Sequence, residues 1–281
     1  MMRRLLGSGV TMAICFGTLT AWAAPVSKEA TVNELMTLSG IEHTLQQIPK
    51  QVLAGFAQQG RKLPVEQHQA LRRALVDAFD VPMMQRHVAT ELQTNLRPEV
   101  MAKTMEWLRS DLGRKMTALE NAAGDPRSMQ DLQAFMKRLE KTPPTQERLQ
   151  LIRRLDMATN STELLLDITE SITVSLASAH DATLPATQRI GADRIRVQIS
   201  RERGNWRPQA QNHVLVTMLY TYRAVGQQEL EQYVGFLETE AGLDYCSQTS
   251  GAFKGAMDLG IQRATSAMMD ILKPPAGRKA I

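Results

Sequence analysis

Residues 105–115 of this chain read Met105-Glu106-Trp107-Leu108-Arg109-Ser110-Asp111-Leu112-Gly113-Arg114-Lys115. A similar stretch follows 129 residues later and reads Val234-Gly235-Phe236-Leu237-Glu238-Thr239-Glu240-Ala241-Gly242-Leu243-Asp244. In each copy an aromatic residue and a leucine precede a hydroxyl residue, an acid, and a glycine three positions after the hydroxyl. Hydroxyl side chains cap helix N-termini, and acids are favourable in the first helical turn. Both copies therefore predict a joint, where one helix ends and the next begins.

Six residues define this structural motif: Trp107, Ser110, Gly113, Phe236, Thr239 and Gly242. Glycine in a helix costs up to about 1 kcal/mol relative to alanine. Its presence in the first turn of both copies predicts that another helix passes too close for a Cβ atom. The alternative is a ligand that approaches the backbone at this point.

The regions around the joints predict an all-α protein. Apolar residues recur at steps of three and four, as on one face of a helix, at Leu35, Leu38, Ile41, Leu45, Ile48, Val52 and Phe56. We expect Thr31 and Glu34 to form a capping box and Pro49 to kink or divide the helix. Residues 189–203 alternate in polarity, but a strand there would have no evident partner, so we favour a helix.

Four patterns recur in the same order in the two halves. Ile48-x3-Val52-x3-Phe56 matches Ile168-x3-Ile172-x3-Leu176, Leu63-Pro64 matches Leu184-Pro185, His87-Val88 matches His213-Val214, and the joint occurs twice. We predict a tandem duplication of a multi-helix unit, with a helical connector and a long C-terminal helix. The predicted divisions are residues 1–23 as signal peptide, 24–122 as repeat 1, 123–146 as connector, 147–273 as repeat 2 and 274–281 as tail.

The N-terminus predicts export. Arg3 and Arg4 precede an uncharged run over residues 5–23 that ends Ala21-Trp22-Ala23, which is typical of a signal peptide cleaved after Ala23. A retained membrane anchor is the alternative; after cleavage we expect no transmembrane span. The predicted location is the periplasm. The mature chain has 31 basic and 29 acidic residues, too little excess charge to predict nucleic-acid binding. It keeps a single cysteine, Cys246, so no intrachain disulfide is possible.

The first joint, Trp107 to Lys115, resembles the signature of a bacterial family of exported α-helical domains of unknown function, whose pattern is Phe-aromatic-x-Ser-Pro-x-Gly-x-Lys. Leu108 stands in place of the second aromatic residue and Asp111 in place of the proline. The second copy keeps only the aromatic, hydroxyl and glycine positions. The resemblance covers about 60 residues of each half. It implies an exported helical domain and assigns no catalytic residue, cofactor or metal.

Candidate catalytic and metal sites are sparse. The chain has no Gly-x-Ser-x-Gly, His-Glu-x-x-His or phosphate-loop motif. Cys246 could be a nucleophile, but without a recognisable partner it is better explained as a small apolar residue. His87 and His213 could meet and bind a metal if the halves pack face to face, although a metal site needs three or four ligands. We predict no cofactor and no metal.

Six arginines form the candidate contact patch: Arg189, Arg194, Arg196, Arg201, Arg203 and Arg207. An anionic lipid surface or an acidic partner could use it, and a solvated helix face is the structural alternative. The leading functional hypothesis is a non-enzymatic periplasmic protein that binds an envelope protein or lipid component in a groove between the repeats. One alternative is a hydrolase-like enzyme acting on an envelope polymer or peptide. The other is a peripheral binder of anionic lipid surfaces.

Overall fold

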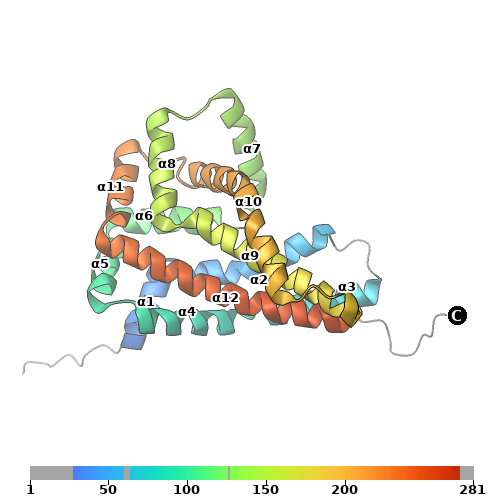
Figure 1. Ribbon diagram of the computed structural model, residues 1–281. Coiled ribbons are helices and arrows are strands. Elements are labelled where there is room, and N and C mark those ends of the chain that lie inside the picture. Colours follow the sequence, from blue (N-terminus) through green and yellow to red (C-terminus); the bar gives the residue numbers. More distant parts are fainter. Residues whose placement is uncertain (1–27, 60–63, 126, 273–281) are drawn as a thin grey trace, which may run out of the picture.

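A computed structural model describes residues 28–59, 64–125 and 127–272 (Figure 1). These residues form helices and no strand, which confirms the all-α prediction. The helices are α1 (Lys28–Leu38), α2 (Ile41–Gln59), α3 (Val65–Ala78), α4 (Val81–Asn95), α5 (Pro98–Arg109), α6 (Asp111–Ala123), α7 (Ser128–Lys141), α8 (Gln146–Thr159), α9 (Ser161–Thr183), the 3₁₀ turn η2 (Ala186–Gln188), α10 (Ala192–Thr221), α11 (Gln227–Leu237) and α12 (Glu240–Leu272).

Two local predictions near the N-terminus are wrong. Helix α1 begins at Lys28, so Thr31 lies inside the helix and does not form its N-cap. The helical conformation is interrupted at Gly40, which has a positive φ of 74°. Glycine adopts this conformation without the steric cost of a Cβ atom. Helix α2 runs through Pro49, so the predicted division there is wrong, and the kink expected as the other effect of Pro49 stays a prediction. The predicted signal peptide (residues 1–23) and the predicted tail (residues 274–281) lie outside the described residues.

The segment 189–203 is helical from Ala192 onward, as predicted. The start of α10 is fixed by the Asp181 carboxylate, which accepts hydrogen bonds from the backbone N–H groups of Ile190 at 2.7 Å and Gly191 at 3.1 Å. Gly191 has a φ of 88°, a conformation in which a side chain would be strained. None of the described helices is both long and apolar enough to cross a membrane.

Two apolar cores hold the helices together. The first is built from α1, α2, α4 and α5, with Leu35, Leu45, Met84 and Leu92 fully buried. The second is built from α8 and α11 with the end of α10, and its centre contains Ile152, Leu155, Leu230 and Val234. In Figure 1, α7, α8 and α11 occupy the upper part of the molecule, and α12 runs below them across its length.

Each core is completed by a helix from the other half of the chain. Helix α12 comes from the second half and contributes Ala252, Ala256, Met257 and Ile261 to the first core. It packs on α3, α4, α5 and α9. Helix α6 comes from the first half and contributes Met116 to the second core. The two halves are therefore interlocked, and neither predicted repeat holds a complete core of its own.

The order of helices is similar in the two halves. Helices α1 to α6 precede the connector α7, and α8 to α12 follow it. In the first half α3 and α4 are separate, whereas α10 is a single helix at the corresponding place in the second half. Pro82 lies at the start of α4, and Pro208, 126 residues later, lies inside α10. This order is in line with a tandem duplication, which remains a prediction.

Candidate functional site

The repeated motif forms two helix joints of the same construction. In the first, Ser110 caps α6, and its Oγ accepts a hydrogen bond from the Gly113 N–H at 3.0 Å. In the second, the Thr239 Oγ1 accepts from the Gly242 N–H at 3.1 Å at the start of α12. Each bond satisfies one of the N–H groups that a helix start leaves without a partner.

The glycines of both joints lie against the end of the preceding helix. A Cβ atom added to Gly113 would overlap the Trp107 carbonyl oxygen and lie 2.9 Å from the Leu108 Cα. At Gly242 it would overlap the Phe236 carbonyl oxygen and lie 2.6 Å from the Leu237 Cα. The atoms that such a Cβ would overlap belong to the backbone of the same joint. Because they have no Cβ, the two glycines allow the chain to change direction sharply there.

The two joints contact each other through their aromatic residues. The rings of Trp107 and Phe236 stack with centroids 4.6 Å apart and planes 8° from parallel. Trp107 also stacks with Tyr233 at 6.1 Å. Beside this contact is an open hollow of about 420 Å³, lined by Lys103, Glu106, Trp107, Ser110, Phe236, Thr239, Glu240 and Ala241. All six motif residues therefore serve the joint and its packing.

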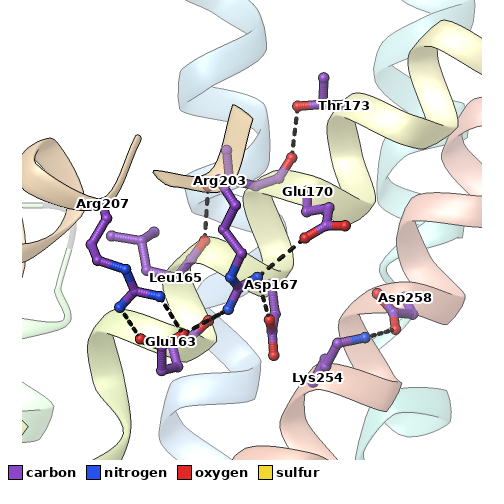
Figure 2. Close-up of polar contacts among 10 residues, drawn as sticks. Glu163, Leu165, Asp167, Glu170, Thr173, Arg203, Arg207, Lys254 and Asp258 are labelled. Atoms are coloured by element: carbon purple, nitrogen blue, oxygen red, sulfur yellow. Dashed lines mark hydrogen bonds and ion pairs between the residues drawn. The ribbon is translucent and has the colours of Figure 1, made fainter. Parts of the chain in front are cut away.

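Two arginines of the predicted contact patch are used inside the molecule. Figure 2 shows Arg203 of α10 beside three carboxylates of α9: Glu163 at 2.8 Å, Asp167 at 2.7 Å and Glu170 at 3.2 Å. Arg207 donates to both carboxylate oxygens of Glu163. Hydrogen bonds from Arg207 and then Arg203 lower the pKa of Glu163 to about 2. These residues hold α10 against α9 and do not form a free cationic surface.

The other four arginines of the patch lie at the surface. Arg189 donates to the carbonyl oxygens of Leu184 and Ala182. Arg196 lies 3.8 Å from Asp193. Arg194 and Arg201 are exposed and make no ion pair with any described residue. Contact with an anionic surface remains a prediction, and it would depend on these exposed side chains.

An apolar cavity of about 230 Å³ opens between helices of the two halves. Its walls come from α2, α3, α9 and α12, and Thr265 is the one residue with a polar side chain among them: Val52, Phe56, Leu71, Ala74, Leu75, Phe79, Ile172, Leu176, Met257, Ile261, Ala264, Thr265 and Met268. Ile172 is 40% exposed and Leu176 45%, so the cavity is accessible from solvent.

A polar cavity of about 390 Å³ lies next to it, between α9, α10 and α12. It is lined by Asp167, Glu170, Ser171, Val174, Ser175, Arg196, Lys254, Asp258, Ile261 and Gln262. Ile261 belongs to the walls of both cavities. The Lys254 ammonium donates to Asp258 Oδ2 at 2.6 Å (Figure 2). Asp258 Oδ1 is buried and has no hydrogen-bond partner among the described residues.

The two candidate histidines do not form a metal site. His87 of α4 packs against Gly255 of α12, whereas His213 is exposed on α10, which packs on α6, α7, α8 and α9. Among the described residues no group of three or more His, Cys, Asp or Glu side chains is placed to hold a metal ion. Neither histidine lines either cavity.

A buried polar cluster in the second core was not predicted from the sequence. The hydroxyls of Tyr222 and Tyr233 both donate to Glu120 Oε1 at 2.7 Å and tie α6 to α11 and the end of α10. Burial raises the pKa of the Glu120 carboxyl, and it raises the pKa of the Cys246 thiol to about 12. A thiol that stays protonated is a poor nucleophile, which agrees with a packing role for Cys246.

The sequence predicts a groove between the repeats without assigning residues to it, and the apolar cavity lies between helices of the two halves. Val52 and Phe56 match Ile172 and Leu176 in the predicted repeats, and all four line the cavity. The periodicity of these matched positions predicts buried helix faces and gives no sign that the faces meet around a cavity. Comparisons of the chain with protein-family models, with curated proteins and with solved structures give no match.

Proposed function

We propose that this protein acts by binding and that its ligand carries an alkyl or acyl chain, which enters the apolar cavity between α2, α3, α9 and α12. The observation that supports this function is the composition of the cavity wall, in which only Thr265 has a polar side chain. Ligand sites in proteins are predominantly apolar with few polar groups. An apolar cavity of roughly 150 Å³ already binds benzene, and this one measures about 230 Å³.

The energy of burying such a chain is sufficient for binding. Each buried methylene contributes about 0.8 kcal/mol, so eight methylenes contribute about 6 kcal/mol. Part of this is lost to the entropy of association. We therefore expect weak to moderate affinity for a simple alkyl compound, with polar contacts of the natural ligand adding to it.

The proposed location is the periplasm, where a protein that binds acyl chains would meet lipid components of the envelope. The basic start and uncharged run of residues 1–23 support export, as does the resemblance of the first joint to exported helical domains. This proposal refines the predicted groove between repeats, because α2 and α3 belong to the first half and α9 and α12 to the second.

The test is displacement of a neutral fluorescent probe, N-phenyl-1-naphthylamine, by decanol. Wild-type protein should bind the probe and release it to decanol. Ala74→Phe places a ring in the cavity and should abolish binding, while Ala102→Phe, on the exposed face of α5, should leave it unchanged. The proposal is rejected if folded wild-type protein takes up neither compound, or if the two variants bind equally well.

A further inference from the structure

The side chain of Phe79 forms part of the apolar cavity wall and lies directly on Gly260 of α12. A Cβ atom added to Gly260 would be 2.5 Å from both Cδ1 and Cε1 of the Phe79 ring. Both residues are buried, and Phe79 is only 4% exposed. The ring therefore occupies the space that a side chain at residue 260 would need.

The backbone on both sides of this contact is held by hydrogen bonds. Gly260 lies inside the continuous helix α12. On the other side, the Phe79 N–H donates to the Leu75 carbonyl oxygen at 3.1 Å. Asp80, the next residue, caps α4 by accepting from the Met83 N–H at 2.9 Å. A side chain at residue 260 would therefore displace the Phe79 ring rather than either backbone.

The displaced ring would move into the cavity. Protein interiors are close-packed, so a buried side chain moves toward the empty space that it borders. For Phe79 that space is the apolar cavity. Glycine is one of the least favourable residues inside a helix, but at residue 260 it leaves room for the ring and keeps this part of the cavity open.

The volume of the cavity limits the length of the chain that it can hold. A cavity of roughly 150 Å³ holds benzene, a ring of six carbon atoms. The apolar cavity, at about 230 Å³, has room in proportion for about nine carbon atoms. The exposed residues Ile172 and Leu176 leave it open to solvent at α9, so further carbon atoms would extend into water.

We propose that the ligand carries one medium-length alkyl chain of about nine carbon atoms, and that the contact of Phe79 with Gly260 sets this length. This inference rests on the proposed function and adds the length of the chain and the residue pair that selects it. Each methylene that the cavity encloses strengthens binding about fourfold, because its apolar surface leaves water. Methylenes beyond the cavity stay in water and add little.

The experiment titrates primary alcohols from hexanol to undecanol into the full mature chain and measures their affinities by calorimetry. For the wild-type protein the affinity should rise about fourfold per methylene up to nonanol and then level off. In Gly260→Ala the added carbon moves the ring into the space of about one methylene, so nonanol should bind about fourfold more weakly. The rise should then end at octanol, and hexanol binding should be unchanged.

Two further variants test whether the ring transmits the effect. Phe79→Leu removes the ring and should extend the rise in affinity beyond nonanol. The double variant of Gly260→Ala with Phe79→Leu should bind nonanol more tightly than Gly260→Ala alone, because the new Cβ no longer displaces a ring.

Gly255→Ala is the matched control. It adds the same methyl group to α12 against another side chain, that of His87, which lines neither cavity. This variant should keep the wild-type dependence of affinity on chain length.

The outcomes separate the two proposals. If no alcohol binds to the folded wild-type protein, both fail. If the affinity keeps rising through undecanol, or if folded Gly260→Ala keeps the wild-type chain-length dependence, the alkyl-binding function stands and the length proposal is overturned. A shift of the same size in Gly255→Ala also overturns it, because a movement of the whole of α12 would then account for both. If Gly260→Ala does not fold, Phe79→Leu decides, and a rise that still ends at nonanol overturns the proposal.

Discussion

Replacing Gly113 by alanine tests whether the repeated motif is a steric joint. Alanine normally stabilises a helix by up to about 1 kcal/mol relative to glycine. At Gly113, however, the new Cβ would overlap the Trp107 carbonyl oxygen and lie 2.9 Å from the Leu108 Cα, and both are backbone atoms that cannot rotate away. Overpacking of this kind costs up to about 3 kcal/mol. We expect a net loss of about 2 kcal/mol.

Urea unfolding measures this loss. With an m-value of about 3 kcal/mol/M, a loss of about 2 kcal/mol lowers the midpoint by roughly 0.7 M. Gly242→Ala should behave in the same way, because its Cβ would overlap the Phe236 carbonyl oxygen. Circular dichroism and tryptophan fluorescence should give coincident transitions, which is necessary for a single free energy of unfolding to be meaningful.

Gly251 provides the control for helix propensity. It lies inside α12, is exposed, and a Cβ there would meet no atom within 4 Å. Gly251→Ala should therefore raise the midpoint, by roughly 0.2–0.3 M for a gain of up to about 1 kcal/mol. The steric interpretation is refuted if Gly113→Ala unfolds at or above the wild-type midpoint.

Three further predictions concern ion pairs, buried groups and the interlocked cores. Hydrogen bonding to Arg207 and Arg203 lowers the pKa of the Glu163 carboxyl from 4.5 to about 2. The stabilisation of the fold by this carboxylate is therefore complete above about pH 4.5 and is lost as the pH falls toward 2. In urea unfolding measured at several pH values, Glu163→Gln should reduce the loss of stability at acid pH. Burial raises the pKa of Glu120 above 4.5, so the folded protein binds a proton at this carboxyl more tightly than the unfolded chain does. The stabilisation from this proton is complete below about pH 4.5 and declines as the pH rises through the folded pKa. Glu120→Gln should remove that decline, and an unchanged pH profile of stability would contradict the prediction. Cutting the chain within residues 142–145 should give two fragments that fold when mixed but not separately, because α6 and α12 each complete the core of the other half. Circular dichroism and size-exclusion chromatography measure this. A folded, monomeric N-terminal fragment would disprove the prediction.

The predictions that succeeded concern short stretches of chain. Ser110 and Thr239 cap helices because a hydroxyl reaches an N–H group three residues later, whatever the rest of the fold. The helical state of 192–203, the connector α7 and the long α12 follow from periodicity in the same way. The capping box at Thr31 failed because α1 continues N-terminally past it.

The candidate site depended on contacts that the sequence does not encode locally. Six arginines within 19 residues look alike in the sequence, yet Arg203 and Arg207 are bound to α9 while Arg194 and Arg201 face solvent. Only the packing of α10 on α9 distinguishes the paired arginines from the exposed ones. The sequence does not reveal this difference locally, because the contact joins residues more than 30 positions apart.

The sequence by itself determined the all-α class, the caps at Ser110 and Thr239 and the two glycine joints, because these depend on side chains within one or two turns of each other. The tertiary structure alone decided that α12 completes the first core and α6 the second, and that Val52, Phe56, Ile172 and Leu176 surround one cavity. The physical reason is that an apolar helix face specifies burial but not the partner that buries it. The partner is selected by the packing of the whole chain.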